Sequence, residues 1–311
     1  MFEVLANLIL TSLFLQSQAD SQATIDNLTQ QEYRLPNSAV RYLQQTAPQQ
    51  KVEAESLGVS VTAKSVLVID KKSAKILYQK NPDRIRSIAS LTKLMTALVF
   101  LDHNPGWDTP ITISGNDYRS GGVTYLIAGE EISARGVFNT ALIASANEAA
   151  VALWRSTGLS EENFIGEMNQ KVQELGMADT VFTDVTGLKN DNASTATDVI
   201  LMVRAALDRP DIFQAVNSKE YYINVINKGI SRRVASTDQI LSQEFGIGSD
   251  TYQVEAGKTG YLEVAGYNFV SQVSNQNNDK ILVVVLGSDT ISDRFVDTKA
   301  VSYWVFNNYV W

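Results

Sequence analysis

The chain has 311 residues, 44% of them hydrophobic, which is enough to bury one large core or two lobes that share a cleft. The formal net charge is −8 and no basic run alternates with aromatic residues, so nucleic acid is not expected as a partner. The chain has no cysteine and one histidine, which excludes typical zinc and thiolate sites. We expect neither a metal nor a cofactor.

The first 19 residues predict an export signal. They are mostly apolar, too short for a membrane span of about 20 residues, and end in Ser17-Gln18-Ala19, a small-x-small cleavage pattern. Signal peptides normally open with a lysine or arginine, whereas the only early charge here is Glu3, so a buried amphipathic helix and a misassigned start are alternatives. Residues 20–62 are rich in glutamine, which is typical of a spacer. We expect an exported protein with its main domain at 63–311.

The central part of the chain reads as helical and its two ends as strands. Apolar runs rich in β-branched residues predict a hairpin at 66–70 and 76–79 and later strands at 221–225, 252–255, 267–270 and 281–286. Three- and four-residue spacing predicts a helical lobe at about 101–215 and a closing helix at 295–309. The order predicts an α+β fold, with one antiparallel sheet built from both chain ends, flanked by helices, and an inserted helical lobe.

Ser90 and Lys93 carry the first indication of chemistry. A serine hydroxyl is a weak nucleophile until a base takes its proton, and a lysine three residues on shares its helical face. The one histidine, His103, lies in a turn-rich sequence that predicts a surface or helix-capping residue. Lysine is therefore the available base. A lone Ser-x-x-Lys is weak evidence, because about one match is expected by chance in a chain of this size.

Two further motifs strengthen the indication. Ser145-Ala146-Asn147 and Lys258-Thr259-Gly260 follow in the order of the S-x-x-K, S-x-N and K-T-G signature, so the chain resembles the penicillin-recognising serine enzymes. The stretches 88–97, 144–150, 168–188 and 258–267 are similar to the D-alanyl-D-alanine carboxypeptidases, the low-molecular-mass penicillin-binding proteins. The resemblance spans about 63–311 and implies the fold of β-lactamases and DD-peptidases.

The resemblance implies a catalytic set. Ser90 would be the acylated nucleophile, Lys93 its base, and Ser145 the group that passes the proton to the leaving amine. Asn147 would hold the acyl-side peptide group. A lysine in a closed site, with the ammonium of Lys258 close by, should lose its charge more readily than a free lysine.

The resemblance also implies how the substrate is held. Lys258 and Thr259 of the K-T-G motif, which Gly260 completes, would bind the terminal carboxylate, and Arg294 stands where the family keeps an arginine for that group. Pairing with Asp293 or Asp297 is the simpler alternative for Arg294. The backbone N–H groups of Ser90 and Tyr261 would form the oxyanion hole.

The implied function is that of a serine-type D-Ala-D-Ala carboxypeptidase that trims peptidoglycan stem peptides and is acylated by β-lactams. It would work in the periplasm or at the outer face of the membrane, with peripheral membrane or cell-wall association. A D,D-endopeptidase that cuts cross-links is the alternative, and a catalytically dead peptidoglycan-binding protein is a third. A β-lactamase is disfavoured, because Glu220 and Asn224 have the spacing of its deacylating pair but lie in a strand-like segment.

Two other patterns are set aside. Gly257-Lys258-Thr259 resembles the end of a phosphate-binding loop, but Tyr252 stands where that loop needs a glycine. Glu130-Glu131 is adjacent rather than spaced like a glycosidase pair, and its position after Gly129 predicts a solvated turn.

Overall fold

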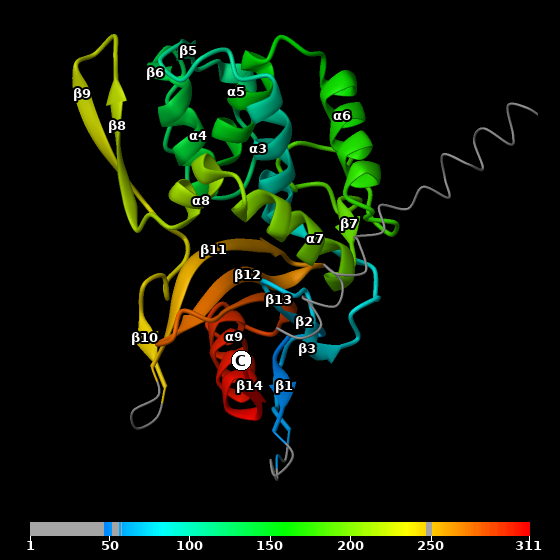
Figure 1. The fold of residues 1–311 in the computed structure, drawn as a ribbon. Helices are drawn as coiled ribbons and strands as arrows, with labels where there is room; N and C mark the ends of the chain where they lie inside the picture. The colour runs from blue at the N-terminus through cyan, green and yellow to red at the C-terminus, as the bar shows by residue number, and fades with distance from the viewer. Residues whose placement is uncertain (1–46, 52–55, 57, 247–250) are drawn as a thin grey trace, which may run out of the picture. The chain divides into compact units, whose positions relative to one another are not determined.

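A six-stranded antiparallel sheet, in the order β10-β11-β12-β13-β2-β3, joins the early and late parts of the chain (Figure 1). Its strands are β2 (Ser65–Asp70), β3 (Ile76–Lys80), β10 (Glu244–Phe245), β11 (Tyr252–Leu262), β12 (Gly266–Asn275) and β13 (Lys280–Ser288). β13 pairs with β2 between Ile281↔Asp70 and Leu286↔Ser65. The predicted α+β class and the sheet built from both ends are confirmed.

This computed structural model describes residues 47–51, 56, 58–246 and 251–311. The predicted export signal lies outside them, as does the spacer as far as residue 46. From Ala47 onward the chain belongs to one compact unit, in which β1 (Gln49–Gln50) pairs with β14 (Tyr309–Val310). No helix in the described part of the chain is long and apolar enough to cross a membrane.

Helices cover both faces of the sheet. α9 (Asp293–Asn308) packs against β12 and β13, and α7 (Ala196–Leu207) packs against β13 and β2. Successive side chains of a strand point to opposite faces, and β13 follows this rule. Leu282, Val284 and Leu286 belong to the core shared with the helical lobe, whereas Val283 and Val285 belong to the core beneath α9. A strand buried on both faces is apolar along its length, as β13 is from Ile281 to Leu286.

The helical lobe stands on the α7 side of the sheet (Figure 1). Its other helices are α3 (Thr92–Asp102), α4 (Ala134–Ile143), α5 (Asn147–Ser156), α6 (Glu161–Glu174) and α8 (Pro210–Val216). α6 begins where the Ser160 hydroxyl accepts the N–H of Asn163, and Gly176 follows its end with φ 72°. These helices agree with the predicted apolar spacing.

One predicted strand lies in a different sheet. Residues 221–225 were expected in the central sheet, but β8 (Glu220–Val225) belongs to a separate four-stranded sheet, ordered β5-β6-β8-β9. The other members are β5 (Pro110–Thr112), β6 (Glu131–Ser133) and β9 (Ile230–Ala235). Ile223 and Val225 are buried, and β8 packs against α4. Alternating polarity identifies a strand but does not identify its partner.

The predicted solvated turn at Glu130 is wrong. Glu130 is fully buried, and its carboxylate accepts hydrogen bonds from Arg232 at 2.7 Å and Lys228 at 3.2 Å. The hydrogen bond from Arg232 does most to lower the pKa of Glu130, to about 2. A buried carboxylate needs such partners, and they arrive from about 100 residues further along the chain.

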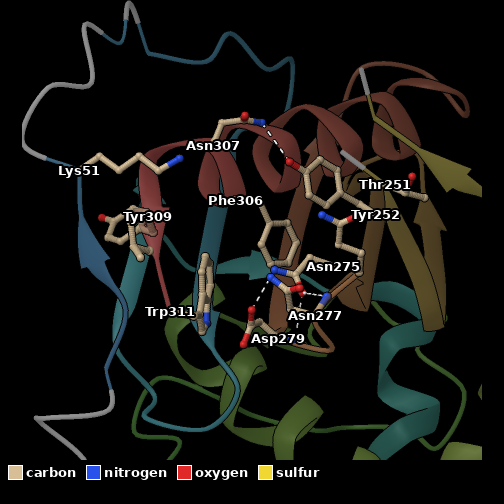
Figure 2. Close-up of a pocket in the computed structure, with 12 residues that line it drawn as sticks. Lys51, Thr251, Tyr252, Asn275, Asn277, Asp279, Phe306, Asn307, Tyr309 and Trp311 are labelled. Atoms are coloured by element: carbon tan, nitrogen blue, oxygen red, sulfur yellow. Dashed lines mark hydrogen bonds between the residues drawn. The ribbon is translucent and has the colours of Figure 1, made fainter. Parts of the chain in front are cut away.

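A pocket of about 270 Å³ lies at the far end of the sheet (Figure 2). Most of its polar groups bond within the protein: Asn275 Nδ2 donates to Asp279 at 2.9 Å, and Asn307 Nδ2 donates to the Tyr252 hydroxyl at 3.1 Å. Tyr252 precedes Lys258 by six strand residues, which corresponds to about 20 Å. This pocket is therefore distant from the K-T-G motif.

Ser90 lies in the short 3₁₀ turn η1 (Ala89–Leu91), which contacts the loop around Gly187 closely. Gly187 has φ 84°, and a Cβ there would lie 2.0 Å from the carbonyl oxygen of Ala89. Just before η1, β4 (Arg86–Ser87) pairs with β7 (Ala193–Ser194). The backbone before Ser90 is thus held against residues about 100 positions away.

Replacing Gly187 by alanine should therefore displace η1. We expect Gly187→Ala to lower the free energy of unfolding by about 2–4 kcal/mol, since it adds a clash to the strain of a left-handed backbone. Gly158→Ala is the matched control: Gly158 has φ 78° but open space around its Cα, so only the strain of about 1 kcal/mol applies. Urea denaturation of both variants measures the difference. Equal destabilisation would show that the Gly187 contact does not hold η1.

Candidate active site

The nucleophile candidate sits at the junction of η1 and α3. The α-helix begins at Thr92, so Ser90 occupies the preceding 3₁₀ turn rather than the helix itself. Lys93, in the first turn of α3, still reaches it: Lys93 Nζ donates to Ser90 Oγ at 3.0 Å. The predicted Ser-x-x-Lys contact is present.

Three acceptors surround the amine of Lys93. Besides Ser90 Oγ, Nζ donates to Asn147 Oδ1 at 2.8 Å and to the carbonyl oxygen of Thr186 at 2.7 Å. An ammonium has three protons and can satisfy all three acceptors. A neutral amine has two protons and one lone pair. Because Asn147 Oδ1 and the carbonyl of Thr186 can only accept, the lone pair is left for the hydroxyl proton of Ser90. The geometry therefore fits Lys93 as a base once it is neutral.

Burial makes that neutral form accessible. Lys93 is 1% exposed, and its burial lowers the pKa to about 7, although the nearby carboxylates of Asp184 and Glu148 act to raise it. Proximity to Lys258 was expected to lower the pKa of Lys93, but burial lowers it and Lys258 is not among the groups that shift it. The pKa of Lys258 is itself well below its ordinary value, first through burial and then through the charge of Lys93.

A second lysine connects the two lobes. Lys258, 1% exposed on β11, donates from Nζ to Ser145 Oγ at 2.7 Å. Ser145 lies between α4 and α5 with φ 60°, a left-handed backbone unusual for a non-glycine residue. Asn147 begins α5, and its Nδ2 donates to the carbonyl of Gly121 at 2.9 Å. The site thus contains two hydrogen-bonded groups, Lys93 with Ser90 and Asn147, and Lys258 with Ser145. Ser145 and Asn147 are two residues apart in the chain, and the charge of Lys93 acts on Lys258.

The K-T-G motif lies inside β11 rather than after a strand, along the edge that contacts η1. A Cβ on Gly260 would lie 2.9 Å from the carbonyl oxygen of Ile88 and 3.2 Å from the backbone nitrogen of Ser90. Only glycine permits this approach. The neighbouring Tyr261 is half exposed and stacks on Tyr267, with 4.3 Å between ring centroids.

Arg294 is buried at the start of α9, and no carboxylate in the described part of the chain forms an ion pair with it. Its side chain is 5% exposed, and its Nε has no hydrogen-bond partner among the described residues. The suggested pairing with Asp293 or Asp297 is absent: Asp297 instead accepts from the backbone nitrogens of Thr62 and Ala63, each at 2.9 Å. Burial lowers the pKa of Arg294 to about 10, which leaves it a cation.

The sequence did not identify the groups that support this site. Asp184 accepts hydrogen bonds from the N–H of Gly187 at 3.0 Å and from Asn192 Nδ2 at 2.8 Å, which orders the loop that carries the Thr186 carbonyl. Glu148 Oε1 accepts the N–H of Tyr125 at 2.7 Å. The sequence drew attention to the region of Thr186 only through the family resemblance of the stretch 168–188. The backbone carbonyl of any residue type can accept a hydrogen bond, so no motif reveals it.

The alternative candidates stand apart from the site. Glu220 pairs with Arg233 on the small sheet, and Asn224 is exposed on the same strand. His103 caps the end of α3, where its Nε2 lies 2.5 Å from Glu167. His103, Glu220 and Asn224 therefore form no contact with Ser90 or Lys93 in the described structure.

The fold and the buried lysine at the serine define a serine enzyme of the penicillin-recognising class. The chain belongs to the D-alanyl-D-alanine carboxypeptidase family, Peptidase S11, whose family model matches residues 47–290. The predicted family is thus confirmed. The chain is accordingly a serine DD-peptidase, a hydrolase acting on peptidoglycan.

Curated relatives include both kinds of DD-peptidase. A D-alanyl-D-alanine endopeptidase of Haemophilus influenzae is 34% identical over 241 residues, 76% of this chain and 80% of the relative. The D-alanyl-D-alanine carboxypeptidase DacC of Escherichia coli is 31% identical over 273 residues, 84% of this chain and 64% of the relative. Penicillin-binding protein D2 of Listeria monocytogenes, solved with cefotaxime bound, superposes with a TM-score of 0.68 at 27% identity, covering 81% of this chain and 100% of the other.

The pKa of Lys93 predicts how reactivity changes with pH. A lysine base works when neutral, so the fraction of active base rises with pH through about 7. We expect the second-order rate constant for labelling Ser90 with a fluorescent penicillin to be about tenfold higher at pH 8 than at pH 6. Stopped labelling reactions resolved by denaturing electrophoresis give the rates, with free penicillin followed in parallel as a stability control. A rate that is flat over this interval would contradict Lys93 as the base.

Proposed function

We propose that the chain is a D,D-endopeptidase that hydrolyses peptide cross-links of peptidoglycan through an acyl-enzyme on Ser90. The endopeptidase relative supports this choice, because it matches at the higher identity and over the larger share of its own length. A D-Ala-D-Ala carboxypeptidase, the function first expected, is the second candidate, and the name of the matching family favours it. Both activities use the same chemistry and differ in the group that leaves.

The hydrogen bond between Lys93 and Ser90 carries the proposal. Neutral Lys93 takes the proton of Ser90 Oγ as Oγ bonds to the carbonyl carbon of the D-alanine. The resulting tetrahedral oxyanion is held by the backbone N–H groups of Ser90 and Tyr261, and each such donor is worth about 3 kcal/mol in comparable sites. Asn147 holds the acyl-side peptide group.

The leaving amine needs a proton as the carbon–nitrogen bond breaks. Ser145 passes to it the proton that Lys93 took from Ser90, while a hydrogen bond from Lys258 Nζ holds the Ser145 Oγ in place. Water then hydrolyses the Ser90 ester and restores the hydroxyl. Lys258, Thr259 and Arg294 hold the carboxylate beside the leaving nitrogen, because buried cations without carboxylate partners suit an anionic ligand.

We further propose that β-lactams acylate Ser90 and that the acyl-enzyme persists. The cefotaxime-bound relative supports acylation. Glu220, which with Asn224 has the spacing of a deacylating pair, is paired with Arg233 at 2.5 Å on the small sheet. The family's action on the cell wall supports export across the cytoplasmic membrane, with the predicted signal at 1–19.

Cross-linked dimeric muropeptides test the reaction. We expect the purified protein to convert them to monomers, as measured by liquid chromatography and mass spectrometry, and Ser90→Ala to abolish the conversion. Loss of terminal D-alanine from uncross-linked pentapeptides, with dimers left intact, would instead establish the carboxypeptidase. Ser87→Ala is the matched control, because it removes a hydroxyl three residues away that has no hydrogen-bond partner in the described structure.

A further inference from the structure

Asp238 lies behind the strand that carries the K-T-G motif, in the segment between β9 and β10. It is 6% exposed, and its Oδ1 accepts the N–H of Ile240 at 2.9 Å. Its Oδ2 has no hydrogen-bond partner among the described residues. That oxygen packs on Gly257, where a Cβ would lie 2.4 Å away. A bare carboxylate oxygen therefore lies against β11 one residue before Lys258.

Asp238 and Arg294 are two buried, incompletely satisfied groups of opposite charge. They interact electrostatically, yet no ion pair joins them, and Arg294 Nε also lacks a partner in the described structure. Buried opposite charges are normally paired, because an unpaired charge away from water is costly. Here Arg294 is left available to bind an external anion, and the carboxylate of Asp238 is close enough to act on that anion.

The residue before Asp238 connects this segment to the binding motif. The hydroxyls of Thr237 and Thr259 share a hydrogen bond of 2.7 Å, and the N–H of Thr237 donates to the carbonyl of Ile143 at the end of α4 at 3.1 Å. Asp238 is thus held in a fixed place behind Thr259 by contacts with both lobes.

We infer that Asp238 is a specificity-determining residue whose negative charge opposes the ligand carboxylate held by Lys258, Thr259 and Arg294. Carboxylate-bearing ligands would then bind weakly when Asp238 is ionised and tightly when it is protonated. The inference rests on the proposed function, since the anion site is the one assigned there. Asp238 touches no reacting atom and acts through the field at that site.

The ionisation of Asp238 falls in an accessible range of pH. Burial raises its pKa to about 6, against the opposing influence of the N–H of Ile240, Arg294 on α9, the N–H of Leu241 and Lys258 on β11. Below pH 6 the group is neutral, so anion binding is strong, and above pH 6 its charge weakens that binding. Acylation rises through about pH 7 because Lys93 becomes neutral, so binding and chemistry change with pH in opposite directions.

Benzylpenicillin and its methyl ester separate these effects, because they differ only in the carboxylate. Stopped-flow acylation gives the dissociation constant before acylation and the acylation rate constant separately. For the acid we expect the dissociation constant to rise about five- to tenfold between pH 5 and pH 8, and for the ester to stay constant. In Asp238→Asn the constant for the acid should stay low throughout, while the acylation rate still rises through pH 7.

Asp289→Asn is the matched control. It also removes one negative charge, from an exposed carboxylate paired with Lys64 five residues before Arg294, and it should keep the wild-type pH dependence. Asp238→Ser removes the charge with a shorter side chain and serves if the asparagine variant does not fold.

Two results would overturn the inference. In the first, the uncharged variants keep the pH dependence of the dissociation constant for benzylpenicillin, which would assign that dependence to Lys258. In the second, the methyl ester shows the same pH dependence as the acid. A purely structural role would instead lower binding and acylation alike at every pH. If the proposed function is wrong, the result is different, because the wild-type protein would then not be acylated on Ser90 at all.

Discussion

The arrangement of the site depends on one buried amine, Lys93 Nζ, which is shielded from water and surrounded by three hydrogen-bond acceptors. α3 supplies Ser90 Oγ through the turn before it, α5 supplies Asn147 Oδ1, and a loop supplies the Thr186 carbonyl. Each acceptor comes from a different part of the chain. The buried amine is stable only when all three elements are docked, so the fold of the helical lobe and the reactivity of the serine depend on the same contacts.

The sheet supplies the other half of the site. β11 presents its edge to η1, and Gly260 allows the backbones to approach where a side chain would collide with Ile88 and Ser90. Lys258 then crosses to Ser145 in the helical lobe. Burial lowers the pKa of both lysines, and the charge of Lys93 lowers the pKa of Lys258 further. The docked lobes thus favour the neutral form of Lys93, which is the form that can act as a base.

The catalytic side chains could be predicted from the sequence, because they occur in recognisable motifs. Ser90, Lys93 and Lys258 were found because their spacing and order resemble a known signature, and the layers of the fold followed from periodicity. Contacts between distant segments could not be read in this way. The partners of Glu130 lie about 100 residues away, and β8 joined another sheet because alternation does not encode a partner. Asp238 could not be predicted either, because its burial and its contact with Gly257 appear only when distant segments are brought together.

A pKa of about 7 means that Lys93 is neutral for much of the time near pH 7. Protein labelled with ¹³C at the lysine ε-carbon, with the Lys93 signal assigned by its absence in Lys93→Arg, gives the pKa of this amine directly by NMR titration. We expect a midpoint at about 7. A midpoint near the ordinary lysine value of about 10.4 would contradict it, because Lys93 would then remain an ammonium at neutral pH and could not take the proton of Ser90.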